Sequence, residues 1–460
     1  MSITLSIIYL IATVTFVIGL KMLGHPETAK KGNLIAAVGM ILAIIGTIFL
    51  HDFEVPSINY ILIGAALLVG TIIGWFIAIK VEMTKMPELV SLFNGFGGAS
   101  AMLIGLVEYS NTIGDAMQTS TVIAAIAIGS ITFTGSLIAW AKLNGSMKDI
   151  RLPKYNLLNN IMFLGLLAFS TYIVMMGGNN AFLIYILLFA SLVYGILFVI
   201  PIGGADMPVV ISLLNSLTGI AAAITGILYG NMVMLVGGIL VGSAGLILTF
   251  VMCDAMNRSL ANVIFGAFGG DSDVGEAAVS KTGGTVKKTT ASDSAILLNY
   301  ASKVVIVPGY GLAVAQAQHV IHELEQLLTK KGVDVSYAIH PVAGRMPGHM
   351  NVLLAESNVD YDKLIEMDDI NPQFPNTDVV LVVGANDVVN PAAHNDPSSP
   401  IYGMPILDVE NAKHIIINKR SMNAGYAGIQ NELFFNQKTS MLFGDEKAAL
   451  TDLVSELKNM

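Results

Sequence analysis

The sequence predicts an α-helical membrane domain of about nine transmembrane helices, followed by a doubly wound α/β domain. Three observations support this. Of the 460 residues, 54% are hydrophobic and only 12% are charged, about half the charge of a typical soluble protein. The charge is uneven, because residues 1–255 contain only 9 of the 24 Lys and Arg residues. After about residue 300, short β-branched runs alternate with helical stretches, which is typical of a parallel sheet.

The membrane domain is assigned to residues 1–265. A helix needs ~20 apolar residues to cross a bilayer. Nine runs meet this requirement, at residues 3–20, 33–50, 58–79, 87–107, 121–141, 157–176, 181–200, 208–228 and 232–253.

The positive charges of this half indicate its orientation. All of them follow the first, third or fifth apolar run, at Lys21, Lys30, Lys31, Lys80, Lys85, Lys142, Lys148, Arg151 and Lys154. Because Lys and Arg accumulate in cytoplasmic loops, the N-terminus is expected outside and the C-terminal half in the cytoplasm.

Two helices carry a repeated pattern. "MPELVSLFNGFGGASA" begins at Met86, and "MPVVISLLNSLTGIAA" begins at Met207, 121 residues later. Both follow cytoplasmic loops, so the repeat is predicted to be parallel. Each copy places one amide, Asn94 or Asn215, roughly 10 Å into an apolar helix. Two interpretations remain open: interhelical hydrogen bonds that only support packing, or a polar constriction on a proton or water path.

The second domain is assigned to residues 292–460, after a linker at 266–291 that is rich in Gly, Ser, Thr and charge. Helices are expected at 312–330 and 445–458. Strands are expected at 303–309, 333–340, 378–385, 412–419 and 439–445, with a short one near 363–367.

A glycine-rich turn follows the first predicted strand. In "VPGYGLAVAQA", Gly309, Gly311 and Val314 occupy the positions of a G-x-G-x-x-G turn, with Val in place of the third glycine. The strand before it and the helix after it are the context in which such a turn binds a pyrophosphate. A dinucleotide site in a Rossmann-like domain is therefore predicted.

The surrounding motifs favour NADP(H). The second strand ends in His340 rather than in the carboxylate typical of NAD sites. Lys419, Arg420 and Ser421 follow a later strand and suit a 2′-phosphate, although an ordinary basic surface loop is the alternative. "GRMPGH" and "GANDVVNP" add polar groups at two further strand ends. Nothing indicates a nucleophile or a metal site.

Several stretches together resemble one family. "PGYGLAVAQAQ", "IHPVAGRMPGHMNVLLAE", "VVGANDVVNPAA", "GMPILDVENAKHIIINKRSMNAGYAG" and "GGADMPVVISLLNS" are similar to the β subunit of proton-translocating NAD(P)+ transhydrogenase, over essentially the whole chain. The resemblance implies a Re/Si-specific enzyme in which hydride transfer from NADH to NADP+ is coupled to proton movement into the cytoplasm. This chain would bind NADP(H), and a partner α subunit would bind NAD(H).

The resemblance also implies roles for individual residues. No side chain is catalytic, since hydride passes directly between nicotinamides, and Asp387 is expected near the nicotinamide. The implied cofactor-binding residues are Gly309, Tyr310, Gly311, Ala313, Val314, Gly344, Arg345, Gly384, Ala385, Asn386, Asp387, Lys419, Arg420, Ser421, Gly425 and Tyr426. The proton path is assigned to Asn94, Asn215 and Asp206. Several bacterial relatives have His where this chain has Asn94, so the protonated group is expected on a partner's helix.

The implied setting is a dimer of αβ units in the lipid of a bacterial inner (plasma) membrane. The net charge of −9 argues against a nucleic-acid partner. The alternative function is a membrane transporter regulated by an NADP(H)-binding domain, which would need no NAD-binding partner. A self-contained NADPH oxidase would need heme-ligating His residues or a flavin site, and the sequence contains no sign of either.

Overall fold

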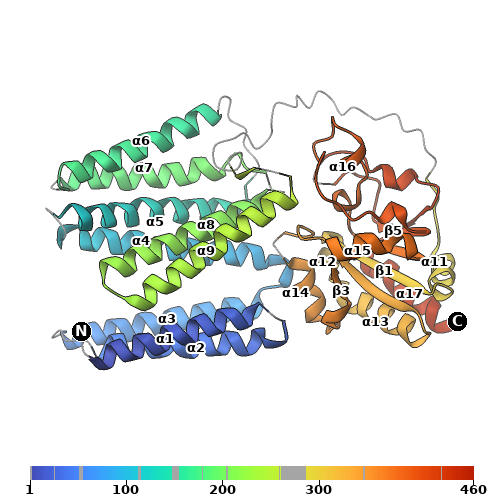
Figure 1. Ribbon diagram of the computed structural model, residues 1–460, viewed down its shortest axis with the longest axis horizontal. Coiled ribbons are helices and arrows are strands. Elements are labelled where there is room, and N and C mark those ends of the chain that lie inside the picture. The colour runs from blue at the N-terminus through green and yellow to red at the C-terminus, as the bar shows by residue number, and fades with distance from the viewer. Residues whose placement is uncertain are drawn as a thin grey trace. The chain divides into compact units, whose positions relative to one another are not determined.

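The structure is a computed structural model. It describes residues 3–24, 26–50, 55–111, 115–147, 155–178, 180–203, 206–257, 259–260, 286–345, 348–425 and 427–460. The chain divides into two units (Figure 1). The membrane unit comprises Met1–Gly204 and Val209–Thr249, and the sheet unit comprises Ala205–Pro208 and Phe250–Met460.

Nine helices in the described residues are long and apolar enough to cross a membrane, as the nine hydrophobic runs predict. They are α1 (Ile3–Leu23), α2 (Pro26–Phe49), α3 (Ser57–Lys80), α4 (Met86–Glu108), α5 (Ala116–Leu143), α6 (Tyr155–Met175), α7 (Ala181–Val199), α8 (Met207–Leu228) and α9 (Met232–Ala255).

Small residues bring these helices close together. A Cβ added to Gly98 on α4 would lie 2.8 Å from the backbone oxygen of Gly129 on α5. A Cβ added to Gly219 on α8 would lie 2.4 Å from the backbone nitrogen of Gly242 on α9. Since nothing larger than glycine fits at these crossings, these glycines allow close helix packing.

The two copies of the repeat run parallel, as predicted. Near the middle of both helices, a Cβ on Gly97 of α4 would lie 2.9 Å from Cγ2 of Thr218 on α8. At their C-terminal ends, the Tyr229 hydroxyl donates to Oε1 of Glu108 at 3.0 Å. Both contacts join residues 121 positions apart, which is the offset of the sequence repeat. Equivalent positions of α4 and α8 therefore lie at the same level.

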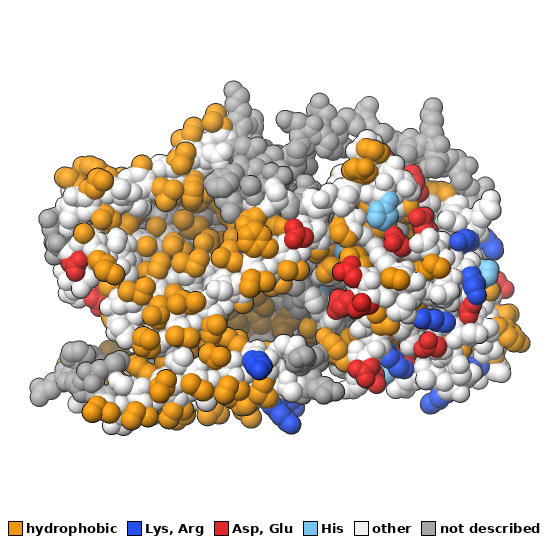
Figure 2. Space-filling view, in the orientation of Figure 1, with side chains coloured by type: hydrophobic (Ala, Val, Ile, Leu, Met, Phe, Trp, Pro, Cys, Tyr) orange, Lys and Arg blue, Asp and Glu red, His pale blue; other side chains and the backbone are white. Residues whose placement is uncertain are grey.

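The outer surface of this unit is apolar. No residue of α3 is buried within the chain. Figure 2 shows hydrophobic side chains spread over the helices, while acidic and basic side chains gather on the sheet unit. A surface of this kind suits hydrocarbon, where every backbone polar group must be satisfied within the helix.

The sheet unit contains six parallel strands in its described part, in the order β3-β2-β1-β4-β5-β6. Each expected strand is present: β1 (Lys303–Pro308), β2 (Asp334–Ile339), β3 (Leu364–Glu366), β4 (Val379–Val383), β5 (His414–Lys419) and β6 (Thr439–Phe443). The order reverses between β1 and β4, and ligands of such sheets bind outside the carboxyl ends of the strands at this point.

Both faces of the sheet are buried. Along β1, Val304 and Ile306 face one core, while Val305 and Val307 face the other. The first core is covered by α11 (Ala291–Asn299), α13 (Gln318–Lys330) and α17 (Glu446–Asn459), and the second includes α15 (Met367–Ile370). The remaining short helices are α12 (Tyr310–Val314), α14 (His349–Glu356) and α16 (Ala392–Asn395).

The single helix expected at 312–330 is wrong, because this segment divides into α12 and α13. Between them, Gln316 adopts a left-handed backbone with φ 50°. The Ala317 N–H then donates to the Leu312 carbonyl at 3.1 Å, a bond typical of a helix end. Apolar periodicity continues through the break, so the sequence pattern alone does not reveal it.

The last residues assigned to the linker pack on the sheet unit. Lys288 forms a parallel bridge with Met441 on β6. The Thr290 hydroxyl accepts from the Asp293 N–H at 3.1 Å and so caps α11. Most of the predicted linker, residues 266–285, lies outside the described residues.

Candidate functional site

Two loops meet where the strand order reverses. The Gly309 N–H donates to the Val383 carbonyl at 2.8 Å, and the Gly311 N–H donates to the Gly384 carbonyl at 2.9 Å. A Cβ on Gly309 would lie 2.4 Å from Cα of Ala385. The glycines of the G-x-G turn therefore let the loop after β1 touch the loop after β4. At the third glycine position of the motif this chain has Val314, whose side chain is exposed, while the neighbouring Ala313 is buried.

The loop after β2 adds a cation beside this turn. The guanidinium carbon of Arg345 lies 4.6 Å from the ring centroid of Tyr310, a cation–π contact. The backbone N–H of Arg345 donates to Nδ1 of His349 at 3.0 Å. Gly344, at φ +112°, packs against the same imidazole. Burial and the Arg345 charge lower the pKa of His349, so its neutral form accepts this bond.

The histidine that ends the second strand, His340, has both ring nitrogens hydrogen-bonded. His340 is buried, its Nε2 donates to the Pro405 carbonyl at 2.9 Å, and its Nδ1 accepts from the Val342 N–H at 3.2 Å. It therefore holds the loop after β2 in place instead of offering a free group to a ribose.

The loop after β4 is joined to the segment after β5. Oδ2 of Asp387 accepts from the Ala427 N–H at 3.0 Å. Nδ2 of Asn431 donates to the Asn386 carbonyl at 2.9 Å. A Cβ on Gly425 would lie 2.6 Å from Oδ1 of Asp387. The predicted residues Asn386, Asp387 and Gly425 thus come together, whereas Tyr426 lies outside the described residues.

Two cations end β5. Nζ of Lys419 donates to the Asn423 carbonyl and lies 4.8 Å from the Phe434 ring centroid. Burial lowers the pKa of Lys419, and the Asp387 charge opposes this shift. Nε of Arg420 donates to Oε2 of Glu446 at 2.9 Å, which raises the pKa of Arg420.

The predicted phosphate-binding groups therefore lie on the same side of the sheet, at the carboxyl ends of its strands. Ser421 closes this segment, with its hydroxyl accepting from the Asn423 N–H at 3.4 Å. The set of cations, glycine turns and backbone groups fits a dinucleotide that carries an additional phosphate. It contains no arrangement of a nucleophile and a base in the described residues.

The membrane unit contains a buried polar contact at the first repeat. Nδ2 of Asn94 on α4 donates to Oγ of Ser136 on α5 at 3.0 Å. The Ser91 hydroxyl donates to the Ser136 carbonyl at 2.9 Å. All three side chains are buried.

The second copy differs from the first. Asn215 is partly buried, and no hydrogen bond of its side chain is found among the described residues. Its neighbours Ser212 and Ser216 donate to the carbonyls of Gly245 and Gly242 on α9. Asp206 lies in the turn before α8 and is partly buried. Since α4 and α8 are parallel and in register, the two asparagines lie at the same level without being hydrogen-bonded to each other.

Comparison with known proteins assigns the family. A family model described as NAD(P) transhydrogenase beta subunit matches residues 5–456. Two relatives described as NAD(P) transhydrogenase subunit beta, from Rhodospirillum rubrum and from a strain of that species, are each 46% identical over 461 residues, which covers 98% of this chain and 98% of theirs. This chain belongs to the NAD(P) transhydrogenase beta subunit family.

Membership confirms the resemblance and its main consequences. As a transhydrogenase beta subunit, the chain is a membrane protein and part of an oxidoreductase that acts on NAD(P). NADP(H) binding in general and an α-subunit partner follow from the family. The transporter alternative is not favoured.

Sequence reasoning missed three residues of this transhydrogenase subunit. Ser136 ends the stretch "GSITFTGS" of the fifth apolar run, and its partner Asn94 is 42 residues away, so no local pattern connects them. His349 ends the motif "GRMPGH", but its contact with Arg345 depends on loop geometry. Glu446 follows β6, at the same end of the sheet as the other loops, and its place just after a predicted strand was a signal available from the sequence.

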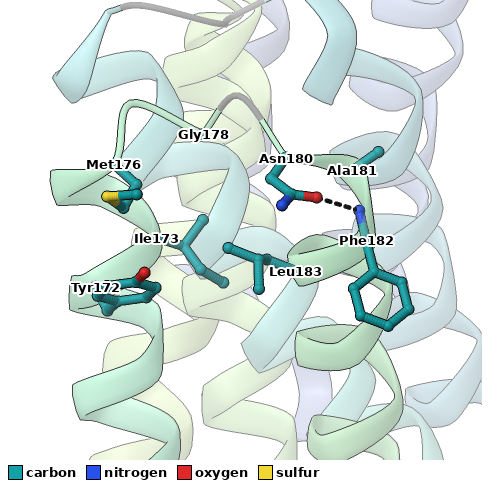
Figure 3. A pocket seen from close by; sticks show the side chains of 8 residues that line it. All are labelled: Tyr172, Ile173, Met176, Gly178, Asn180, Ala181, Phe182 and Leu183. Atoms are coloured by element: carbon teal, nitrogen blue, oxygen red, sulfur yellow. Dashed lines mark hydrogen bonds between the residues drawn. The ribbon is translucent and has the colours of Figure 1, made fainter.

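A cavity among the described residues lies elsewhere, at the hairpin between α6 and α7 of the membrane unit. It measures about 430 Å³ and is lined by Tyr172, Ile173, Met176, Gly178, Asn180, Ala181, Phe182 and Leu183 (Figure 3). Oδ1 of Asn180 accepts from the Phe182 N–H at 3.0 Å, which caps α7. The lining contains no cation, so this cavity does not suit a dinucleotide.

Proposed function

We propose that this chain is the NADP(H)-binding and proton-conducting subunit of a transhydrogenase. The observation that carries the proposal is the convergence of Arg345, Lys419 and Arg420 on the sheet edge that also holds the glycine turn. NADP(H) bound there accepts or gives up a hydride. Gly309–Val314 would face the pyrophosphate, Arg345 another phosphate, and Lys419, Arg420 and Ser421 the 2′-phosphate.

One dinucleotide site is not sufficient for the reaction. Direct hydride transfer needs two nicotinamides within about 3–3.5 Å of each other. The second nucleotide, NAD(H), belongs to the partner α subunit in this proposal. The loop of Gly384, Ala385, Asn386 and Asp387 would support the nicotinamide and ribose. Asp387 would also hold the segment after β5 in place, by accepting from the Ala427 N–H.

The membrane unit would conduct the proton. Amides and hydroxyls hold water without the cost of a buried charge, which is several kcal/mol in a bilayer. Asn94 with Ser136, and Asn215, supply such groups, and Asp206 adds a carboxylate in the turn before α8. The protonated group itself would belong to a helix of the partner, because Asn94 does not titrate.

The distribution of Lys and Arg supports the orientation. Residues 1–265 would span a bacterial inner membrane with the N-terminus outside, and residues 292–460 would lie in the cytoplasm after a linker at 266–291. Protons would then enter the cytoplasm during NADPH formation, in a dimer of αβ units with Re/Si specificity.

The test is purification with native partners, followed by reconstitution into vesicles. Hydride transfer between NADH and an NADP+ analogue should require both subunits and should accelerate when a proton gradient is directed inward through the enzyme. Turnover by this chain alone would contradict the single-site assignment. Turnover that is insensitive to the gradient would contradict proton coupling.

A further inference from the structure

The buried carboxylate of Glu446 lies between Arg420 and the glycine turn at Gly311, both of which are proposed to bind phosphates. The side chain of Glu446, the first residue of α17, is only 5% exposed. Its Oε2 accepts from Nε of Arg420 at 2.9 Å. Its Oε1 lies against the glycine turn, since a Cβ on Gly311 would be 2.6 Å from this oxygen.

The position of Glu446 stabilises its charge. The N-terminal end of a helix favours a negative group, and α17 has 14 residues. Asp445 caps the same helix by accepting from the N–H groups of Lys447 and Ala448. Nε of Arg420 lies 2.9 Å from Oε2 of Glu446 and 3.8 Å from Oδ2 of Asp445, so Glu446 is the closer of two carboxylates of this chain that already neutralise the guanidinium.

A ligand phosphate must share Arg420 with that carboxylate. Glu446 occupies the Nε edge of the guanidinium, whose other nitrogens form the rest of a rigid planar fork. An anion hydrogen-bonded to those nitrogens would lie roughly 5 Å from the carboxylate, given normal hydrogen-bond lengths. Like charges at this distance repel, and burial of Glu446 limits screening by salt.

We propose that Glu446 competes with the 2′-phosphate of NADP(H) for Arg420 and is a specificity-determining residue of this subunit. It lowers the preference for NADP(H) over NAD(H) and speeds NADPH release. This inference rests on the proposed assignment of Lys419, Arg420 and Ser421 to the 2′-phosphate. If Glu446 instead served to position Arg420 for the ligand, its removal would have the opposite sign.

The decisive variant is Glu446→Gln in the full chain, purified in detergent without its partner. Glutamine keeps the shape and an oxygen acceptor for Nε of Arg420, but it carries no charge. Titration calorimetry should show NADP+ binding tightened by about tenfold and NAD+ binding unchanged. Stopped-flow chase should show NADPH dissociation slowed by a similar factor. If the Gln variant does not fold, Glu446→Ala should also tighten NADP+ binding.

The matched control is Asp452→Asn, which removes the same charge from an exposed position on α17 and should change neither affinity. Arg420→Ala tests the underlying assignment separately. An Arg420→Ala variant with unchanged NADP+ affinity would contradict the 2′-phosphate clamp itself. A different result would overturn the competition and leave the clamp standing. In that case Arg420→Ala weakens NADP+ binding, while the Glu446 variants bind NADP+ no more tightly than the unchanged chain.

Discussion

Nδ2 of Asn94 donates to the hydroxyl oxygen of Ser136 at 3.0 Å, which joins α4 to α5 at a buried position. Because this oxygen also has a proton to donate, the pair is a short hydrogen-bonded chain with no formal charge. The amide of Asn94 in the first copy of the repeat thus has a hydrogen-bond partner on α5. Asn215 in the second copy has no such bond among the described residues.

Replacing Asn94 tests whether this pair conducts. Asn94→Leu should lower proton uptake during hydride transfer several-fold, because an apolar side chain interrupts the polar chain at Ser136. Asn94→His should retain coupling, since imidazole donates, accepts and titrates. Proton uptake by reconstituted vesicles is the readout, with Phe96→Leu as an exposed control on the same helix. Normal uptake by the Leu variant would leave Asn94 with a packing role only.

Asn215→Leu should be more severe and abolish proton-coupled turnover while NADP+ binding stays intact. Its amide has no protein partner in the described residues, so water is the expected partner. Ser216→Ala is the matched control, because it removes only a packing hydrogen bond to Gly242, worth about 1 kcal/mol. Equal effects of the two substitutions on vesicle uptake would mean that stability, not conduction, is being measured.

Lys419→Ala should weaken NADP+ binding by at least about tenfold and leave NAD+ binding nearly unchanged. A charge-assisted hydrogen bond contributes roughly 1.5–3 kcal/mol, and only NADP+ carries the 2′-phosphate. Calorimetry on the purified chain measures both affinities. Lys438→Ala, which removes an exposed cation paired with the Glu410 carbonyl, is the control. A parallel loss for both nucleotides would contradict the clamp.

The sheet unit should fold alone, and better from residue 286 than from residue 292. Starting at 292 removes the cap of α11 by Thr290 and two backbone hydrogen bonds between residues 287–289 and Met441. We expect the free energy of unfolding to fall by about 1–2 kcal/mol, half of which should reappear in Thr290→Ala. Urea unfolding of both pieces provides the comparison. Identical midpoints would show that residues 286–291 add nothing.

Acid should destabilise this unit through His340. Burial lowers the pKa of His340 to about 4, against its usual 6.5. Between these values the unfolded chain binds a proton that the folded chain does not. The contribution is therefore fully present above about pH 6.5, and about 3 kcal/mol is lost as the pH falls to about 4.

His349 has a lowered pKa as well, so the slope of stability against pH should shrink in His340→Gln without vanishing. Urea unfolding of the piece from residue 286, at several pH values between about 4.5 and 7, measures both slopes. A slope unaffected by His340→Gln would assign the acid sensitivity to other groups.

Local patterns predicted the elements well and their contacts poorly. The nine apolar runs define their helices by length and hydropathy, and the six β-branched runs define their strands by composition. The break at Gln316 has no such signal, because it depends on one residue's left-handed backbone. The same holds for the site. Strand ends indicated Arg345, Asp387 and Lys419 as candidates, and the structure brings the ends of these parallel strands to one side of the sheet.

Pairings across long sequence separations were not predictable in this way. The partner of Asn94 and the carboxylate beside Arg420 depend on which faces of two helices, or two loops, are turned together. The repeat offset is the exception. The two copies were predicted to be parallel because both follow cytoplasmic loops, and the register of α4 and α8 follows the offset of 121 residues.

The bridge between Lys288 and Met441 has a consequence for self-association. A sheet edge with free backbone N–H and carbonyl groups invites pairing with another molecule. One edge of this sheet, β3, is only three residues long. The other edge, β6, is occupied at Met441 by the incoming chain on both its N–H and its carbonyl. Residues 287–289 thus also shield this edge, and a version that lacks residues 286–291 would expose a template for aggregation.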